Sequence, residues 1–117
     1  MTTIHPKKQI LNRYGGNPII TNEMMPFSCR GVFNSSAVKH QGKYIMIVRA
    51  EGYNLLDSFW LAYSDDGYHW QIGDMVPLPE TEEYRQFGAN QYDPRITKIG
   101  DIYYITFCVH GGTCAWG

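Results

Sequence analysis

Short apolar runs, separated by turns that contain glycine and aspartate, divide most of this chain into segments of strand length. Residues 43–49 form a nearly continuous apolar run, which is typical of a strand buried on both faces. A glycine turn at 40–42 precedes this run, and residues 65–67 form a hairpin turn because Asp-Gly tolerates positive φ. The pattern predicts strands at residues 31–39, 43–49, 58–64, 69–72, 95–99 and 102–108, with 69–72 at a sheet edge.

The pattern also repeats at a constant spacing of 59 residues. Asn34 in the first copy corresponds to Asp93 in the second, Lys39 to Lys98 and Tyr44 to Tyr103. Each copy has a polar head residue, a short β-branched run, a glycine-containing turn and an aromatic-rich apolar run. A fixed period of this length indicates a repeat architecture, and four strands in up-and-down order make one blade of a β-propeller. The repeat therefore predicts an all-β propeller.

The repeat divides the chain into three parts. We expect an N-terminal arm and lead-in at 1–30, a first blade with its crossover loop at 31–92, and the start of a second blade at 93–117. The acidic, proline-containing loop at 73–90 either covers one end of the barrel or is a solvated crossover between blades. Trp116 and Gly117 would begin the third strand of the second blade. Because propellers have about four to eight blades, we expect the N-terminal part of a longer protein; a self-contained small β-domain is the alternative.

Composition narrows the class of function. The net charge of −1 provides no strong field toward nucleic acid, and no run is long enough to cross a bilayer. Aromatic residues make up 15% of the chain, which fits a sugar-facing surface or a packed core. The N-terminus lacks the apolar stretch of a signal peptide. The spacing of the cysteines and histidines matches no metal motif, and we interpret the cysteines as reduced thiols in a cytosolic protein. These residues are Cys29, Cys108, Cys114, His40, His69 and His110.

Asp93 is the sharpest candidate for chemistry. Pro94 is expected to hold Asp93 in an extended conformation at the head of a buried strand, near the axis on which blades converge. Desolvation there can raise the pKa of a carboxyl group, so that it acts as a proton donor. Arg95, two residues on, is expected on the same strand face, where it can hold an anion or a sugar hydroxyl. The alternative is an aspartate that caps a turn, with Arg95 in a structural ion pair.

Other polar residues occupy related positions. Asn34 is equivalent to Asp93, but an amide can orient hydroxyl groups and cannot act as an acid. Ser35 adds a small hydrogen-bonding group beside it. Arg49 ends the second predicted strand, and a buried pair with Glu51 is its structural interpretation. The aspartates of the 65–67 turn are assigned to turn chemistry, and Trp70 to packing within the blade.

Six motifs follow the order found in glycoside hydrolase family 130. They lie at residues 17–19, 33–37, 42–44, 48–52, 64–70 and 92–97. Over residues 13–117 the chain resembles the N-terminal third of these β-mannoside phosphorylases, and Tyr-Asp-Pro-Arg at 92–95 is the most specific block. The resemblance implies a five-bladed β-propeller, of which this chain covers about the first two blades. It also implies that inorganic phosphate attacks the anomeric carbon and releases mannose 1-phosphate with inversion.

Matched residue by residue, the resemblance assigns roles in such a site. Asp93 is implied as the general acid, with the proton passing through a sugar hydroxyl. Asn34, Arg49 and Arg95 are implied contacts of the mannosyl unit, with Ser35 as a weaker candidate. One acid suffices when phosphate is the nucleophile, whereas inverting hydrolases use two carboxyl groups. The segment 53–57 lacks a basic residue that some relatives carry there, and the family's phosphate-binding residues lie beyond residue 117.

The sequence thus predicts a cytoplasmic phosphorylase for β-linked manno-oligosaccharides or mannosyl-glucose. Its expected partners are the oligosaccharide and phosphate, without nucleic acid, membrane, metal or further cofactor, and the N-terminal arm can serve contacts in a homo-oligomer. The alternatives are a β-mannosidase or other propeller glycoside hydrolase, and a non-catalytic glycan-binding propeller. The 117-residue chain alone is expected to be inactive.

Overall fold

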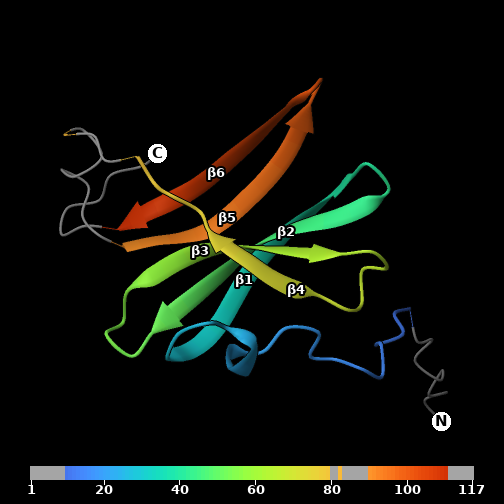
Figure 1. Ribbon diagram of the computed structural model, residues 1–117, viewed down its shortest axis with the longest axis horizontal. Helices are drawn as coiled ribbons and strands as arrows, with labels where there is room; N and C mark the ends of the chain where they lie inside the picture. The colour runs from blue at the N-terminus through green and yellow to red at the C-terminus, as the bar shows by residue number, and fades with distance from the viewer. Residues whose placement is uncertain (1–9, 80–81, 83–89, 111–117) are drawn as a thin grey trace, which may run out of the picture.

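The computed structural model describes residues 10–79, 82 and 90–110, and strands dominate these residues (Figure 1). The lead-in contains one short 3₁₀ helix, η1 (Asn22–Met24). The predicted all-β class is confirmed. Cys114 and the strand predicted at 116–117 lie outside the described residues, as does most of the loop between 80 and 89. The strands are β1 (Cys29–His40), β2 (Lys43–Gly52), β3 (Asp57–Ser64), β4 (Gln71–Met75), β5 (Asn90–Ile99) and β6 (Ile102–His110).

The strands form two antiparallel sheets. Strands β1 to β4 pair in sequence order, which is the up-and-down order predicted for one blade, and β5 pairs with β6. Figure 1 shows the β5–β6 hairpin on one side of the first sheet and the lead-in on the other. A hydrogen bond from the Ile96 backbone N–H to Ser36 Oγ (3.1 Å) joins β5 to β1, and a contact between His40 and Tyr103 joins the two hairpin ends.

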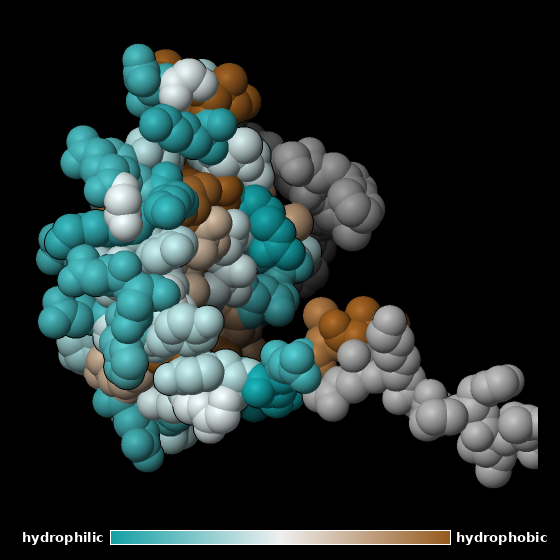
Figure 2. Space-filling model, turned by 90° about the vertical axis from the view of Figure 1, so that its right-hand side faces the viewer, coloured by the Kyte–Doolittle hydropathy of each residue, from teal (hydrophilic) through white to brown (hydrophobic). Residues whose placement is uncertain are grey.

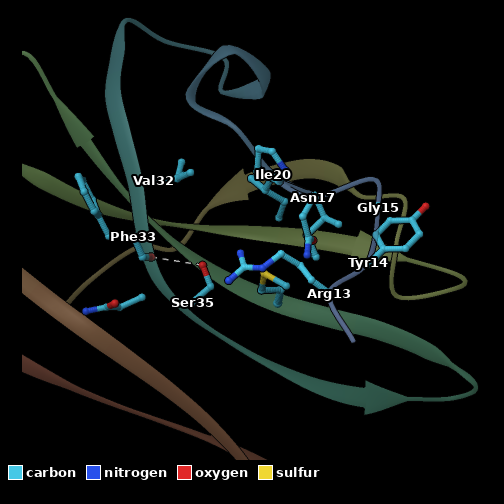
Figure 3. A pocket seen from close by; sticks show the side chains of 12 residues that line it. Arg13, Tyr14, Gly15, Asn17, Ile20, Val32, Phe33 and Ser35 are labelled. Atoms are coloured by element: carbon cyan, nitrogen blue, oxygen red, sulfur yellow. Dashed lines mark hydrogen bonds between the residues drawn. The ribbon is translucent and has the colours of Figure 1, made fainter. Parts of the chain in front are cut away.

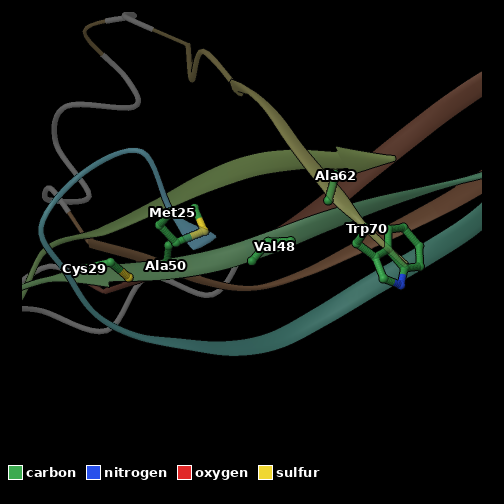
Figure 4. Packing of buried hydrophobic residues seen from close by; sticks show 6 residues of the cluster. All are labelled: Met25, Cys29, Val48, Ala50, Ala62 and Trp70. Carbon is green, nitrogen blue, oxygen red and sulfur yellow. The ribbon is translucent and has the colours of Figure 1, made fainter. Parts of the chain in front are cut away.

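Each face of the first sheet has its own apolar cluster, because side chains alternate along β2. One face packs on the lead-in through a cluster that extends from Cys29 to Trp70 (Figure 4). On the other face, Ile47 and Phe59 are fully buried and pack with Ile96 of the second sheet. The side of the molecule that carries the hairpin turns is mostly hydrophilic (Figure 2). Strand β2 is therefore buried on both faces, as the sequence predicts.

At least one end of every strand differs from the prediction, and the starts of β4 and β5 differ for a local reason. Strand β4 begins at Gln71 rather than at residue 69, because the Asp66 carboxylate binds the backbone N–H groups of Tyr68 and His69 (2.8 Å each), which keeps that segment out of the sheet. Strand β5 begins at Asn90 rather than at residue 95, because residues 90–92 pair with β6 before an irregularity in the ladder.

That irregularity is a β-bulge, and β1 carries an equivalent one. The register breaks between Phe33 and Ser36 in β1, and between Tyr92 and Arg95 in β5. Within these breaks Asn34 has φ 20° and Asp93 has φ 53°. Asparagine and aspartate tolerate positive φ better than other residues with side chains. The predicted extended backbone at Asp93 is therefore wrong, because the bulge removes this residue from the ladder.

The turn between β3 and β4 should make stability depend on pH. The His69 backbone N–H, the His69 ring and the Tyr68 N–H all bond the Asp66 carboxylate and hold its pKa well below its usual value. The folded pKa lies below the unfolded value of about 3.9, so the contribution is complete above that pH and is lost as the pH falls. We expect Asp66→Asn to lower the thermal midpoint at pH 7, and the difference from wild type to shrink below about pH 4.

Asp65→Asn is the matched control for this prediction. Among the residues that the structure describes, Asp65 pairs with Lys43 across 3.0 Å, and its side chain is 82% exposed. Such surface ion pairs contribute little to stability. A difference between Asp66→Asn and wild type that stays constant from pH 7 to pH 3 would contradict the assignment.

Candidate active site

Two side chains from different sheets meet at the bulges. Asn34 Nδ2 donates a hydrogen bond to Asp93 Oδ1 at 2.6 Å. A bulge redirects a side chain away from the regular alternation of its strand, and both strands use one at the equivalent repeat position. Pro94, which is fully buried, anchors the segment that carries Asp93. The 59-residue repeat thus places an amide against a carboxylate.

Arg49 of β2 completes the contacts of this pair. Its Nη1 lies 3.6 Å from Asp93 Oδ1, and its side chain is 19% exposed. The guanidinium carbon lies 5.4 Å from the ring centre of Phe33 and 5.6 Å from that of Tyr92. These aromatic residues precede Asn34 and Asp93, so the repeat also supplies both rings. Cation–π contacts of this kind attract the guanidinium, so both rings help to hold Arg49 at the bulges.

Asp57 holds the other edge of the Arg49 guanidinium. Arg49 Nε and Nη2 each donate a hydrogen bond of 3.0 Å to one carboxylate oxygen of Asp57, whose side chain is completely buried. The predicted Arg49–Glu51 pair is wrong, because Glu51 pairs with Arg30. Sequence reasoning missed Asp57; an acidic residue at the start of a strand, eight positions after an arginine in the preceding strand, is the signal that was available.

Two predicted contacts lie outside this cluster. Ser35 is exposed, and its hydroxyl donates to the Phe33 carbonyl at 3.3 Å. Arg95 is exposed, and its Nη1 donates to the Pro94 carbonyl at 3.0 Å. The bulge between Tyr92 and Arg95 interrupts the two-residue alternation that predicted a shared face with Asp93. The ion-pair partner of Asp93 is Arg49.

A pocket of about 740 Å³ adjoins Asn34, between the lead-in and β1. Arg13, Tyr14 and Asn17 of the lead-in and Phe33 and Ser35 of β1 line it, and Figure 3 shows the Ser35 side chain beside that of Arg13. Guanidinium, amide and hydroxyl groups beside aromatic rings provide the hydrogen bonds and apolar surfaces of a ligand site. The sequence predicts only an arm and lead-in at 1–30, since this segment carries no repeat that marks it as part of a site.

The arrangement is suited to proton transfer near a neutral ligand. The Asp93 side chain is 37% exposed, so the described residues leave its carboxyl group accessible. The charges of Arg49 and Asp57 cancel, so the three side chains together are neutral when Asp93 is protonated and carry one negative charge when it is ionised. Among the residues that the structure describes, no three His, Cys, Asp or Glu side chains form a metal site, and no helix is long and apolar enough to cross a membrane. Cys29 and Cys108 are free thiols.

Comparison with known proteins gives the arrangement a family context. The sequence model of glycoside hydrolase family 130, described as β-1,4-mannooligosaccharide phosphorylase, matches residues 4–115. A β-1,4-mannooligosaccharide phosphorylase from Ruminococcus albus is 33% identical over 109 residues, which cover 86% of this chain and 32% of the relative. A β-1,2-mannobiose phosphorylase from Listeria innocua is 36% identical over 62 residues, which cover 50% of this chain and 17% of the relative. The aligned region therefore spans a third or less of the length of either relative.

Proposed function

This chain belongs to glycoside hydrolase family 130, and we propose on that basis that the full-length protein is an inverting β-mannoside phosphorylase. Its substrates are inorganic phosphate and a β-linked manno-oligosaccharide or mannosyl-glucose, and its sugar phosphate product is mannose 1-phosphate. Relatives named for phosphorolysis of β-1,4-mannooligosaccharides and β-1,2-mannobiose support this reaction class. The observation that carries the proposal is the accessible Asp93 carboxyl group, which Asn34 and Arg49 contact.

Asp93 is the general acid of the proposed reaction. A phosphate oxygen forms a bond to the anomeric carbon while the glycosidic carbon–oxygen bond breaks. The leaving oxygen takes a proton that originates from Asp93 and passes through a sugar hydroxyl. Phosphate already carries negative charge and attacks without deprotonation by a second carboxylate, whereas an inverting hydrolase needs such a base to activate water.

Asn34 and Arg49 are the proposed contacts of the mannosyl unit. Asn34 is fixed by its bond to Asp93, and Arg49 is already neutralised by Asp57, so these residues offer hydrogen bonds rather than net positive charge. A cluster without net positive charge suits a neutral sugar better than a phosphate dianion. We therefore place phosphate on basic residues outside this cluster. Ser35 and Arg95 remain predicted contacts of the substrate.

The proposed architecture is a five-bladed β-propeller. The first sheet is the first blade, which with its crossover loop extends over 31–92, and the β5–β6 hairpin starts the second blade at 93–117. The arm and lead-in occupy 1–30. Support comes from the four-strand order of the first sheet and from the two equivalent bulges, which lie in the first strand of each sheet. In this arrangement Asn34 and Asp93 belong to neighbouring blades and face the same central site.

A phosphate-dependence assay on the full-length protein tests the function. We expect mannose 1-phosphate from β-1,4-mannobiose or mannosyl-glucose only when inorganic phosphate is present. Free mannose at the same rate with and without phosphate would instead establish a β-mannosidase. Binding of these sugars without any product would establish a glycan-binding protein.

A further inference from the structure

Asp57 and Arg49 form the most completely buried ion pair among the described residues. The Asp57 carboxylate is fully buried, and both of its oxygens accept bonds from Arg49. A buried carboxylate without a partner is strongly unfavourable, so this ion pair stays formed in the folded protein. The two parallel bonds also fix the plane of the guanidinium, which a single contact would not do.

Asp57 is in turn fixed to the strand that carries Asp93. The Asp57 backbone N–H donates to Asn90 Oδ1 at 2.9 Å, and Gln91 Nε2 donates to the Asp57 carbonyl at 2.6 Å. Asn90 and Gln91 begin β5, and Asp93 follows them at the bulge. Asp57 therefore holds Arg49 at a set distance from Asp93 without contacting Asp93 itself.

The geometry of the guanidinium shows what this arrangement accomplishes. Nε and Nη2 are occupied by Asp57, which leaves Nη1 to point at Asp93 Oδ1 and at any ligand beside it. We propose that Asp57 is a positioning residue that aims Nη1 of Arg49 at the reacting site and thereby sets the rate of mannoside phosphorolysis. The effect on the rate of phosphorolysis rests on the proposed function, whereas the placement of Arg49 by Asp57 does not.

Kinetics of Asp57→Asn in the full-length protein test the inference. The amide keeps the shape of the carboxylate but offers one acceptor oxygen, so Arg49 loses its two-bond support. We expect kcat/KM to fall about 10²-fold, mainly through kcat, because a small misplacement of a reacting group has an effect of that order. Glu51→Gln is the matched control, since it removes a carboxylate from the Arg30–Glu51 pair, and it should retain activity.

The double variant with Arg49→Gln separates positioning from general stability. If Asp57 acts through Arg49, Asp57→Asn should change kcat/KM less than about threefold once Arg49 is absent, because neighbouring residues in one network are not additive. Equal fold losses in both backgrounds would overturn the inference. Arg49→Lys replaces Arg49→Gln if the glutamine variant does not fold, since its ammonium still neutralises the buried Asp57.

A crystal structure of Asp57→Asn tests whether Asp57 places Arg49, and this test does not depend on the activity of the variant. Nη1 of Arg49 should move away from Asp93 Oδ1, and an unchanged Arg49 would overturn the inference. Failure of the wild-type protein to form mannose 1-phosphate would instead reject the proposed function, so the two failures are distinguishable.

Discussion

Asp93→Asn should reduce the kcat of the full-length protein for mannoside phosphorolysis by about 10²- to 10⁴-fold, the usual range for loss of a general acid. The amide cannot donate the required proton, but it keeps an oxygen at the position where Asn34 and Arg49 make their contacts. Asparagine also tolerates positive φ, and Asn34 shows this at the equivalent bulge. The variant should therefore fold and bind the sugar while losing turnover. Release of mannose 1-phosphate at saturating substrate measures the effect.

Asp101→Asn is the control for this experiment. Asp101 is exposed in the turn between β5 and β6, so its replacement should leave kcat within about twofold of wild type. The thermal midpoint of Asp93→Asn, compared with that of wild type, verifies folding. Normal turnover by a folded Asp93→Asn protein would reject Asp93 as the acid. If the wild-type protein binds these sugars but does not turn them over, the glycan-binding alternative is favoured.

Phe59→Ala should give the largest loss of stability among single substitutions in the described core, about 3–5 kcal/mol. Phe59 is completely buried, pairs in register with Arg49, and meets the Phe107 ring edge-on with centroids 5.5 Å apart. Its truncation leaves a cavity between the sheets that carry Asn34 and Asp93. Urea unfolding of the full-length protein measures the loss, and the midpoint should fall well below that of wild type.

Tyr53→Ala is the matched aromatic control for Phe59→Ala. The Tyr53 side chain is 71% exposed in the turn after β2, so its removal should change the free energy of unfolding by less than about 0.5 kcal/mol. Similar losses from both substitutions would contradict the role of Phe59 in joining the two sheets.

The two equivalent bulges show what the sequence repeat could predict and what it could not. The 59-residue spacing predicted that Asn34 and Asp93 are equivalent, and the structure gives both a positive φ at a break in register. The spacing did not reveal that the two side chains bond to each other, because a repeat defines equivalence along the chain and not the contact between copies. Similarly, the Asp-Gly turn was evident, but the backbone hydrogen bonds that Asp66 accepts, and that delay the start of β4, were not.

By itself, the sequence determined the all-β class, most strand positions, the equivalence of Asn34 and Asp93, and the family. These properties depend on local patterns: alternation of apolar residues, turn residues and ordered motifs. Only the tertiary structure decided that Arg49 pairs with Asp57 rather than Glu51, and that Arg95 bonds the Pro94 carbonyl. Ion-pair partners depend on strand register and on bulges, where a shift of one residue moves a side chain to the opposite face of the sheet.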